Sequence, residues 1–449
     1  MTSAASPGSK TTRPWPSPAY AWYVMTVMVI AYAFAIVDRS IISLLVQPIK
    51  ADLGVTDTQI GLLQGLAFAI CYSTIGLVMG VITDRTDRRS LLAGGILVWS
   101  VATAACGLAD NFTELFIARV FVGLGEACVM PVSGSLIADY LPPKARAKAY
   151  GILLLGGTIG TAAGAILGGN AVAIADTARL LGPEWIDGLR NWQIVFLAVG
   201  LPGALVALIF QLTVREPVRR ETIGQTAWSL KPLLTHAKLN WFAYLAIMLS
   251  AILNVMCIYA QIAWVPTFAM RVYQWTPEDA GWFMGSTAIV GATSSITVGW
   301  FMSWLIAKGR DDAPLLAIAL HGASCMVFGA LACLSPTGSL MIVFMLFKAI
   351  TSNWSSAALL MGLSQITPNE QRGQIVAIYT LVNGLISLSA GAYFIGLLSD
   401  HVFTEPTGIR YSLTVIFVVA GGLATLLVLA GRPAFRAAAD RAKVWAEQS

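Results

Sequence analysis

The chain has 449 residues, of which 57% are hydrophobic and only 11% are charged. Soluble domains carry about 25% charged residues, so this composition argues against a soluble enzyme or binding domain. The formal net charge of +5 is small for this length and gives no support to nucleic-acid binding.

The apolar residues gather in long runs along the chain. A helix rises 1.5 Å per residue, so about 20 apolar residues cross the roughly 30 Å of hydrocarbon in a bilayer. The sequence predicts twelve such runs, at residues 20–47, 58–82, 91–109, 113–140, 147–174, 191–214, 241–270, 278–308, 313–334, 338–366, 372–399 and 408–432. The predicted fold class is an all-α membrane protein with twelve transmembrane helices.

Lys and Arg are distributed unevenly between the two sets of loops. Five of the 28 basic residues lie in or beside the loops that follow odd-numbered runs: Lys50, Arg179, Arg190, Arg271 and Arg410. Three more lie deep inside runs, and the other 20 lie in the tails, in the remaining loops or at the run ends beside them. The positive-inside rule then predicts that both termini are cytoplasmic. We expect a multi-pass protein of a bacterial inner membrane.

The longest polar interruption divides the chain into two halves. The predicted organisation is an N-terminal tail (1–19), six helices (20–214), a cytoplasmic linker (215–240), six more helices (241–432) and a C-terminal tail (433–449). Residues 142–147, after helix 4, resemble residues 368–373, after helix 10, at an offset of 226 residues. Such parallel duplication of six-helix bundles is a standard transporter plan, with the binding site between the bundles near mid-membrane.

Five charged residues lie deep inside the apolar runs, away from their ends: Asp38, Arg39, Arg119, Glu126 and Lys348. A charge at bilayer depth costs about 2.5–3.5 kcal/mol, so such residues normally face a polar interior and serve function. Arg119 and Glu126 are seven residues apart and share one helix face, about 10 Å apart. We expect Asp38 to pair with Arg119, and Arg39 with Glu126. The alternative is that these pairs only join helices 1 and 4, a role that suits Arg39 and Glu126 better.

Lys348 is predicted to lie at a depth close to that of Arg119. It would give the interior three basic and two acidic groups, which favours an anionic or zwitterionic ligand. The alternative is a lysine that extends its stem to the membrane surface.

Three motifs carry a family resemblance. The loop between helices 2 and 3 runs from Gly80 through Asp84 to Arg89, with Asp87 in place of the usual glycine; helix 4 reads Arg-Val-Phe-Val-Gly-Leu-Gly-Glu-Ala over 119–127; helix 1 carries Asp-Arg at 38–39. Together they resemble the major facilitator superfamily, most closely its spinster-type branch of sphingolipid and lysolipid transporters. The anion:cation symporter branch shares similar features in helices 1 and 4 and is the alternative. The resemblance implies two pseudo-symmetric six-helix bundles.

The resemblance also implies roles for the motif residues. The loop is expected to latch the two halves on the cytoplasmic side through Gly80, Asp84, Arg85, Arg88 and Asp139; the alternative is a basic anchor alone. A substrate anion that captures Arg119 would leave Asp38 free to take up a proton, so Asp38 and Glu126 are the candidate proton-coupling residues.

Polar and aromatic residues of both halves suit an amphipathic ligand, although each aromatic could equally serve packing. The candidate substrate-binding residues are Arg39, Arg119, Lys348, Tyr259, Trp264, Asn353, Trp354, Tyr379 and Asn383. In helix 5 a glycine stripe (Gly156, Gly160, Gly164 and Gly168) predicts a close helix contact.

Other chemistry has little support in the sequence. The three histidines, His236, His321 and His401, lack metal-ligand spacing, and no nucleophile constellation or phosphate-binding loop is evident. We therefore expect no enzyme activity, no metal and no cofactor besides the proton as coupling ion. The prediction is a monomeric, proton-coupled, alternating-access transporter in contact with membrane lipids, which moves a small amphipathic, lipid-like anion or zwitterion. The alternatives are a proton-coupled symporter of small organic anions and an uncoupled lipid facilitator or scramblase.

Overall fold

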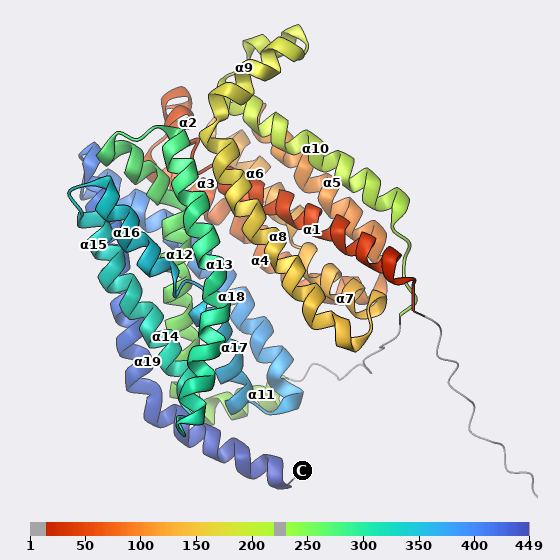
Figure 1. The fold of residues 1–449 in the computed structure, drawn as a ribbon, viewed down its shortest axis with the longest axis vertical. Helices are drawn as coiled ribbons and strands as arrows, with labels where there is room; N and C mark the ends of the chain where they lie inside the picture. The colour runs from red at the N-terminus through yellow and green to blue at the C-terminus, as the bar shows by residue number, and fades with distance from the viewer. Residues whose placement is uncertain (1–14, 220–229, 449) are drawn as a thin grey trace, which may run out of the picture.

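The computed structural model describes residues 15–219 and 230–448. Within these residues, twelve helical segments are long and apolar enough to cross a membrane, as the sequence predicts. They form two bundles of six spans (Figure 1), called here the N-half (15–213) and the C-half (241–448).

Several spans are broken into two helices. The spans of the N-half are α1 (Pro18–Ile41), α3 with α4 (Asp57–Gln64, Leu66–Arg85), α5 (Arg88–Cys106), α6 with α7 (Phe112–Glu126, Val129–Tyr140), α8 (Pro143–Gly169) and α10 (Asn191–Thr213). Those of the C-half are α12 (Trp241–Tyr273), α13 (Pro277–Ala307), α14 with η2 and α15 (Ala313–Ser324, Cys325–Gly329, Ala330–Leu334), α16 with α17 (Gly338–Ala349, Trp354–Ile366), α18 (Asn369–His401) and α19 (Ile409–Gln448). Short helices outside the spans are α2 (Val46–Leu53), α9 (Ala171–Leu181), η1 (Glu184–Gly188), α11 (Leu230–Leu239) and η3 (Pro406–Gly408).

Two of the breaks occupy equivalent positions in the two halves. The fourth span is interrupted between Glu126 and Val129, and the tenth between Ala349 and Trp354. Adding the offset of 226 residues found in the sequence to the position of the first break gives the position of the second. Breaks inside spans leave backbone polar groups at membrane depth, which are tolerated only where they are buried in protein or line a cavity. The charged Glu126 and Lys348 lie directly at these breaks.

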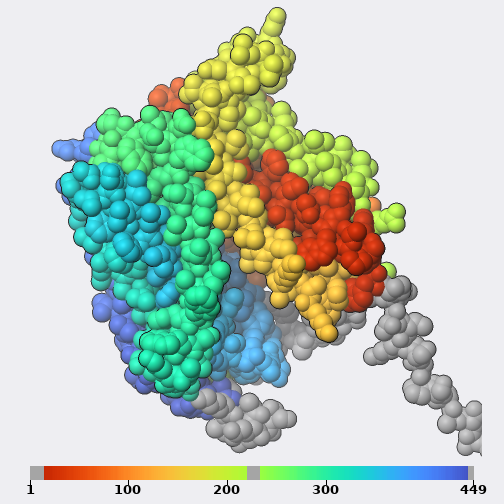
Figure 2. All heavy atoms as spheres, in the orientation of Figure 1, coloured from red at the N-terminus to blue at the C-terminus, as the bar shows by residue number. Residues whose placement is uncertain are grey.

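Within residues 15–219 and 230–448, the two halves pack closely on one side of the molecule. We call the side on which α1 begins and α19 ends the terminal side, and the opposite side the distal side (Figure 1). On the distal side α3 packs against α18 and α8 against α13. Backbones touch there: a Cβ on Gly61 would lie 2.6 Å from the Ala392 carbonyl oxygen, and one on Gly281 would lie 2.4 Å from that of Ala165. Figure 2 shows the halves separating toward the terminal side.

The glycine stripe of α8 packs within the N-half. Gly156, Gly160 and Gly164 face Val29, Ala33 and Val37 of α1. The predicted close helix contact is therefore present, and its partner is the first span.

The C-terminal segment is helical well past the predicted end of the last span. α19 continues through Pro433 to Gln448, where the sequence predicts a tail from 433. Asp312, at the start of α14, is fully buried and accepts hydrogen bonds from Arg432 (2.6 Å) and Arg436 (3.1 Å). Of the other predicted segments, residues 1–14 and 220–229 lie outside the described residues, and α11 lies within the predicted linker.

Candidate functional site

The four charged residues of the N-half form two pairs between α1 and α6. Arg39 donates to Glu126 Oε2 from Nε (2.7 Å) and from Nη2 (2.5 Å). Arg119 Nη1 lies 3.4 Å from Asp38 Oδ2. Both pairings are those that the sequence predicts. Their cause is local: adjacent residues on α1 point about 100° apart, while residues seven apart on α6 share a face.

The two pairs are not equally saturated. Asp38, Arg119 and Glu126 are each 1% exposed. Within the described residues, Asp38 Oδ1, Arg119 Nε and Glu126 Oε1 are buried and have no hydrogen-bond partner. A buried polar atom left unpaired costs about 1–3 kcal/mol, more when charged. Unmade hydrogen bonds beside a long Asp38–Arg119 contact are consistent with groups that exchange partners. In a purely structural pair, we would expect all hydrogen-bonding atoms to be paired.

Arg39 is held by aromatic rings as well as by Glu126. Its guanidinium carbon lies 4.3 Å from the ring centroid of Phe68 and 4.4 Å from that of Tyr72. Both rings come from α4, so the second span fixes a cation of the first through cation–π contact. These two rings could not be predicted as partners of Arg39, because nothing in the sequence of a single span distinguishes them from lipid-facing aromatics.

The arginines line a cavity between the halves. A cavity of about 300 Å³ is walled by Arg39, Arg119 and Gln64 from the N-half and by Tyr259 and Asn353 from the C-half, with other residues. A second cavity of about 730 Å³ lies beside it and has the same Tyr32, Ile36, Thr161, Ile258, Ile262, Asn353 and Ser356 in its wall. Charged, aromatic and apolar surfaces are therefore continuous across the interface.

The larger cavity is mostly apolar and reaches the seam between α8 and α13. Its wall includes Leu154 and Leu155 of α8 and Ile296 of α13, all of which are more than half exposed. The groove between these two helices is visible in Figure 2.

The remaining candidate substrate-binding residues stand away from these two cavities. Trp264 donates from Nε1 to the Ala392 carbonyl (2.8 Å), and Trp354 donates to Thr297 Oγ1 (3.0 Å). Asn383 accepts from Ser387 (2.8 Å). These three, with Tyr379 and Lys348, line neither cavity. Of the predicted binding residues, the structure brings Arg39, Arg119, Tyr259 and Asn353 together at one cavity.

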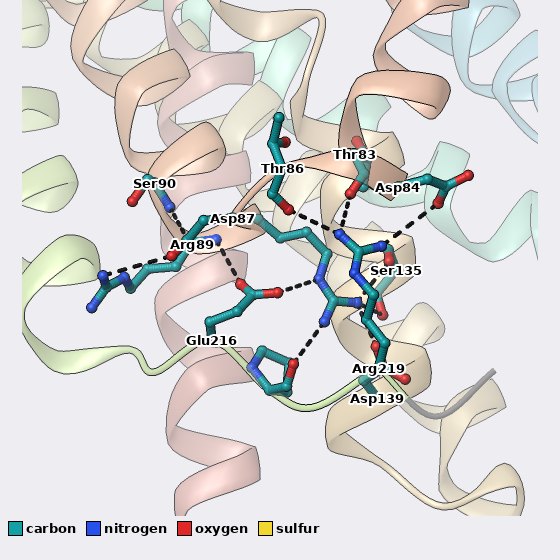
Figure 3. A network of polar contacts seen from close by, with 12 residues as sticks. Thr83, Asp84, Thr86, Asp87, Arg89, Ser90, Ser135, Asp139, Glu216 and Arg219 are labelled. Atoms are coloured by element: carbon teal, nitrogen blue, oxygen red, sulfur yellow. Dashed lines mark hydrogen bonds and ion pairs between the residues drawn. The ribbon is translucent and has the colours of Figure 1, made fainter. Parts of the chain in front are cut away.

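The predicted latch residues gather on the terminal side of the N-half (Figure 3). The buried Arg88 donates to Asp139 (2.5 Å), Ser135 Oγ (2.9 Å) and Glu216 (2.7 Å). Asp84 lies 4.0 Å from Arg219. Arg85 is exposed, and a Cβ on Gly80 would meet nothing within 4 Å. With the halves apart on this side, the network joins the N-half to the start of the linker. The part played by Glu216 was not predicted from the sequence.

A polar lock on the distal side was also missed. Arg271, at the end of α12, donates to Asp57 from Nη1 (2.6 Å) and Nη2 (2.8 Å). Asp400, near the end of α18, accepts from Thr58 N (2.7 Å) and Thr58 Oγ1 (2.5 Å). Asp57 is the first residue of α3, so an acid of the C-half also caps a helix of the N-half. Among the described residues, Asp57–Arg271 is the only ion pair that joins the halves. We call Asp57, Thr58, Arg271 and Asp400 the distal lock.

Twelve membrane-spanning helices in two related bundles, with buried charges beside their interface, are the architecture of a membrane transporter. Residues 28–327 match the family model of the Major Facilitator Superfamily, and the chain belongs to that family. The expected fold and family are thereby confirmed.

Several relatives resemble the chain over most of its length. The crystal structure of a bacterial homologue of the human lysosomal transporter Spinster, inward-facing and unoccupied, superposes with a TM-score of 0.78 at 23% identity, covering 95% of this chain and 98% of that one. An MFS-type efflux pump of Mycolicibacterium smegmatis is 24% identical, with 86% of each chain covered. Protein spinster homolog 1 of Xenopus laevis is 24% identical, covering 85% of this chain and 74% of that one. A gallate transporter of Pseudomonas putida is 24% identical, with 94% of each covered. The spinster-like resemblance holds for the fold.

Proposed function

We propose that this protein is a proton-coupled transporter of an amphipathic, lipid-like anion or zwitterion. The observation that carries the proposal is the junction of two cavities: one presents Arg39 and Arg119, and the other is apolar and reaches the seam between α8 and α13. A charged head group fits in the first cavity where it joins the second, and an acyl or ring system fits in the second. A volume of 300–1,000 Å³ is typical of small-molecule sites.

In this proposal, the buried carboxyl groups couple the movement of substrate to that of protons. Arg119 contacts Asp38 only at 3.4 Å and has an unpaired Nε, so an anionic head group can draw the guanidinium toward itself. Asp38 then loses its counter-ion in an apolar setting and takes up a proton. Glu126 is the second candidate carrier, because only one of its oxygens is engaged by Arg39.

The proposal assigns the terminal side to the cytoplasm, from the distribution of Lys and Arg, and the membrane to the bacterial inner membrane. The structure then corresponds to an inward-open state. A single chain contains the complete cavity, so the proposed transporting unit is the monomer, with membrane lipids around it.

The test is uptake of oleoyl-lysophosphatidylglycerol into proteoliposomes with and without a pH gradient. The proposal expects gradient-stimulated flux that Arg119→Ala abolishes, with gallate a poor competitor. Strong competition by gallate would favour the symporter of small organic anions, a reading supported by the gallate transporter among the relatives. Lysolipid exchange at the same rate with and without the pH gradient would instead indicate an uncoupled facilitator or scramblase.

A further inference from the structure

Lys348 is a buried cation for which the described residues supply no acidic partner. Its side chain is 1% exposed and belongs to the last turn of α16, next to the break in the tenth span. The carbonyl end of α16 favours a positive charge there, and the ammonium lies 5.1 Å from the ring centroid of Phe417. Within the described residues, its ammonium donates to Gln261 Oε1, at 2.5 Å. Neither cavity is lined by Lys348 itself.

Gln261 connects this hidden charge to the cavity. It comes from the middle of α12 and lines the larger cavity. An amide carries one acceptor oxygen and two N–H donors. The reverse orientation would place its NH₂ group against the ammonium, donor to donor, so Lys348 fixes which way the amide faces. The oxygen is turned to Lys348, and the NH₂ group is left to donate elsewhere, polarised by the charge behind it.

We propose that Gln261 is the contact of the C-half with the substrate's anionic head group and that Lys348 is its positioning residue. This inference rests on the proposed function and narrows its substrate class. Arg39 and Arg119 approach from the N-half through the adjoining cavity, and the Gln261 amide approaches from the C-half. The ligand that satisfies both is an amphiphile whose head group carries at least two acceptor oxygens, such as a phosphate or carboxylate. One head group then bridges the halves.

The test compares two lysolipids with the same oleoyl chain, the anionic lysophosphatidylglycerol and the zwitterionic lysophosphatidylcholine. Their binding to the purified full chain in detergent is measured by intrinsic tryptophan fluorescence. Gln261→Glu replaces the donors by a carboxylate that pairs with Lys348, so the variant should fold. We expect the ratio of affinities, anionic to zwitterionic, to fall about tenfold or more. Both lipids carry a phosphate and lose the hydrogen bond, but the added negative charge repels the net anionic lipid, whereas the choline cation of the zwitterion offsets it.

Lys348→Met frees the amide to rotate and should lower the same ratio several-fold, while Lys348→Arg should restore it. A merely structural role of Lys348 would change the melting temperature without moving the ratio. Gln371→Glu, the same substitution outside both cavities, is the matched control and should leave the ratio unchanged.

An unchanged ratio in Gln261→Glu, with the wild type binding both lipids, would overturn this inference and leave the proposed function standing. If the wild type binds neither lipid, the proposed function itself fails.

Discussion

Removing Arg271 from the distal lock should open the distal side of the protein. The lock is made of contacts between the halves, and Arg271 supplies its only ion pair within residues 15–219 and 230–448. Arg271→Gln deletes this pair and leaves Asp57 bound to Lys50, which belongs to the same half. The substitution therefore destabilises only the state in which the halves are in contact on the distal side.

The size of the effect follows from the geometry. Both hydrogen bonds of Arg271 are charge-assisted, and its side chain is 12% exposed and that of Asp57 is 5% exposed. Breaking a fully buried pair costs about 3–5 kcal/mol, and partial exposure reduces this to about 2–3 kcal/mol. The ratio of distally closed to distally open molecules should fall by about 30- to 140-fold.

Double electron–electron resonance measures this ratio directly. Spin labels at Asp187→Cys and Glu405→Cys, both exposed distal positions, with the half-buried Cys71 replaced by serine, report the separation of the halves. Lys50→Gln is the matched control: it removes another ion pair of Asp57, but one inside the N-half, and should leave the distances unchanged. Equal distance distributions for Arg271→Gln and wild type would refute the reasoning.

Three further results are expected. Gly61→Leu should also favour the distally open state, because a side chain there meets the α18 backbone at 2.6 Å and overpacking costs about 1–3 kcal/mol; the same labels would show it, and unaltered distances would contradict it. Arg39→Lys should lose the stacking on two rings and about 1–2 kcal/mol of stability, seen as a lower melting temperature in detergent. Burial raises the pKa of Asp312, but hydrogen bonds from Arg432 and Arg436 outweigh it and hold the pKa below its usual range. Asp312→Asn should therefore lower the melting temperature at neutral pH. The difference should begin to shrink as the pH falls below about 4, the usual pKa of Asp, and should vanish only once the pH has passed the lowered pKa of the folded protein; a difference that does not change with pH would contradict this ion-pair role.

The central pairs could be predicted from the sequence because charges at membrane depth are costly and few. The N-half has only four such charges, two on the first span and two on the fourth: Asp38, Arg39, Arg119 and Glu126. Few pairings were therefore possible, and helix periodicity determined which side chains share a face. The spans themselves followed from length and hydropathy. The break after Glu126 was not predicted, although Pro131 in the first turn of α7 lacks the N–H that a continuous helix would bond to the Ala127 carbonyl.

The distal lock could not be predicted in the same way. Asp57, Arg271 and Asp400 lie near span ends, where charged residues are common and carry no signal of which loop they face. The aromatic residues of the C-half could not be distinguished from the sequence either. Tyr259, Trp264 and Trp354 all lie within apolar spans, yet of these three only Tyr259 lines either of the two cavities. Which side of a span faces the other half depends on how the bundles dock.

Proton movement on addition of substrate tests the exchange of partners at Arg119 most directly. Proteoliposomes loaded with the pH indicator pyranine receive oleoyl-lysophosphatidylglycerol from outside, for wild type and Asp38→Asn. The account predicts an internal acidification that depends on the lysolipid in the wild type, and lysolipid binding without acidification in Asp38→Asn. Acidification of equal size in both proteins would contradict it.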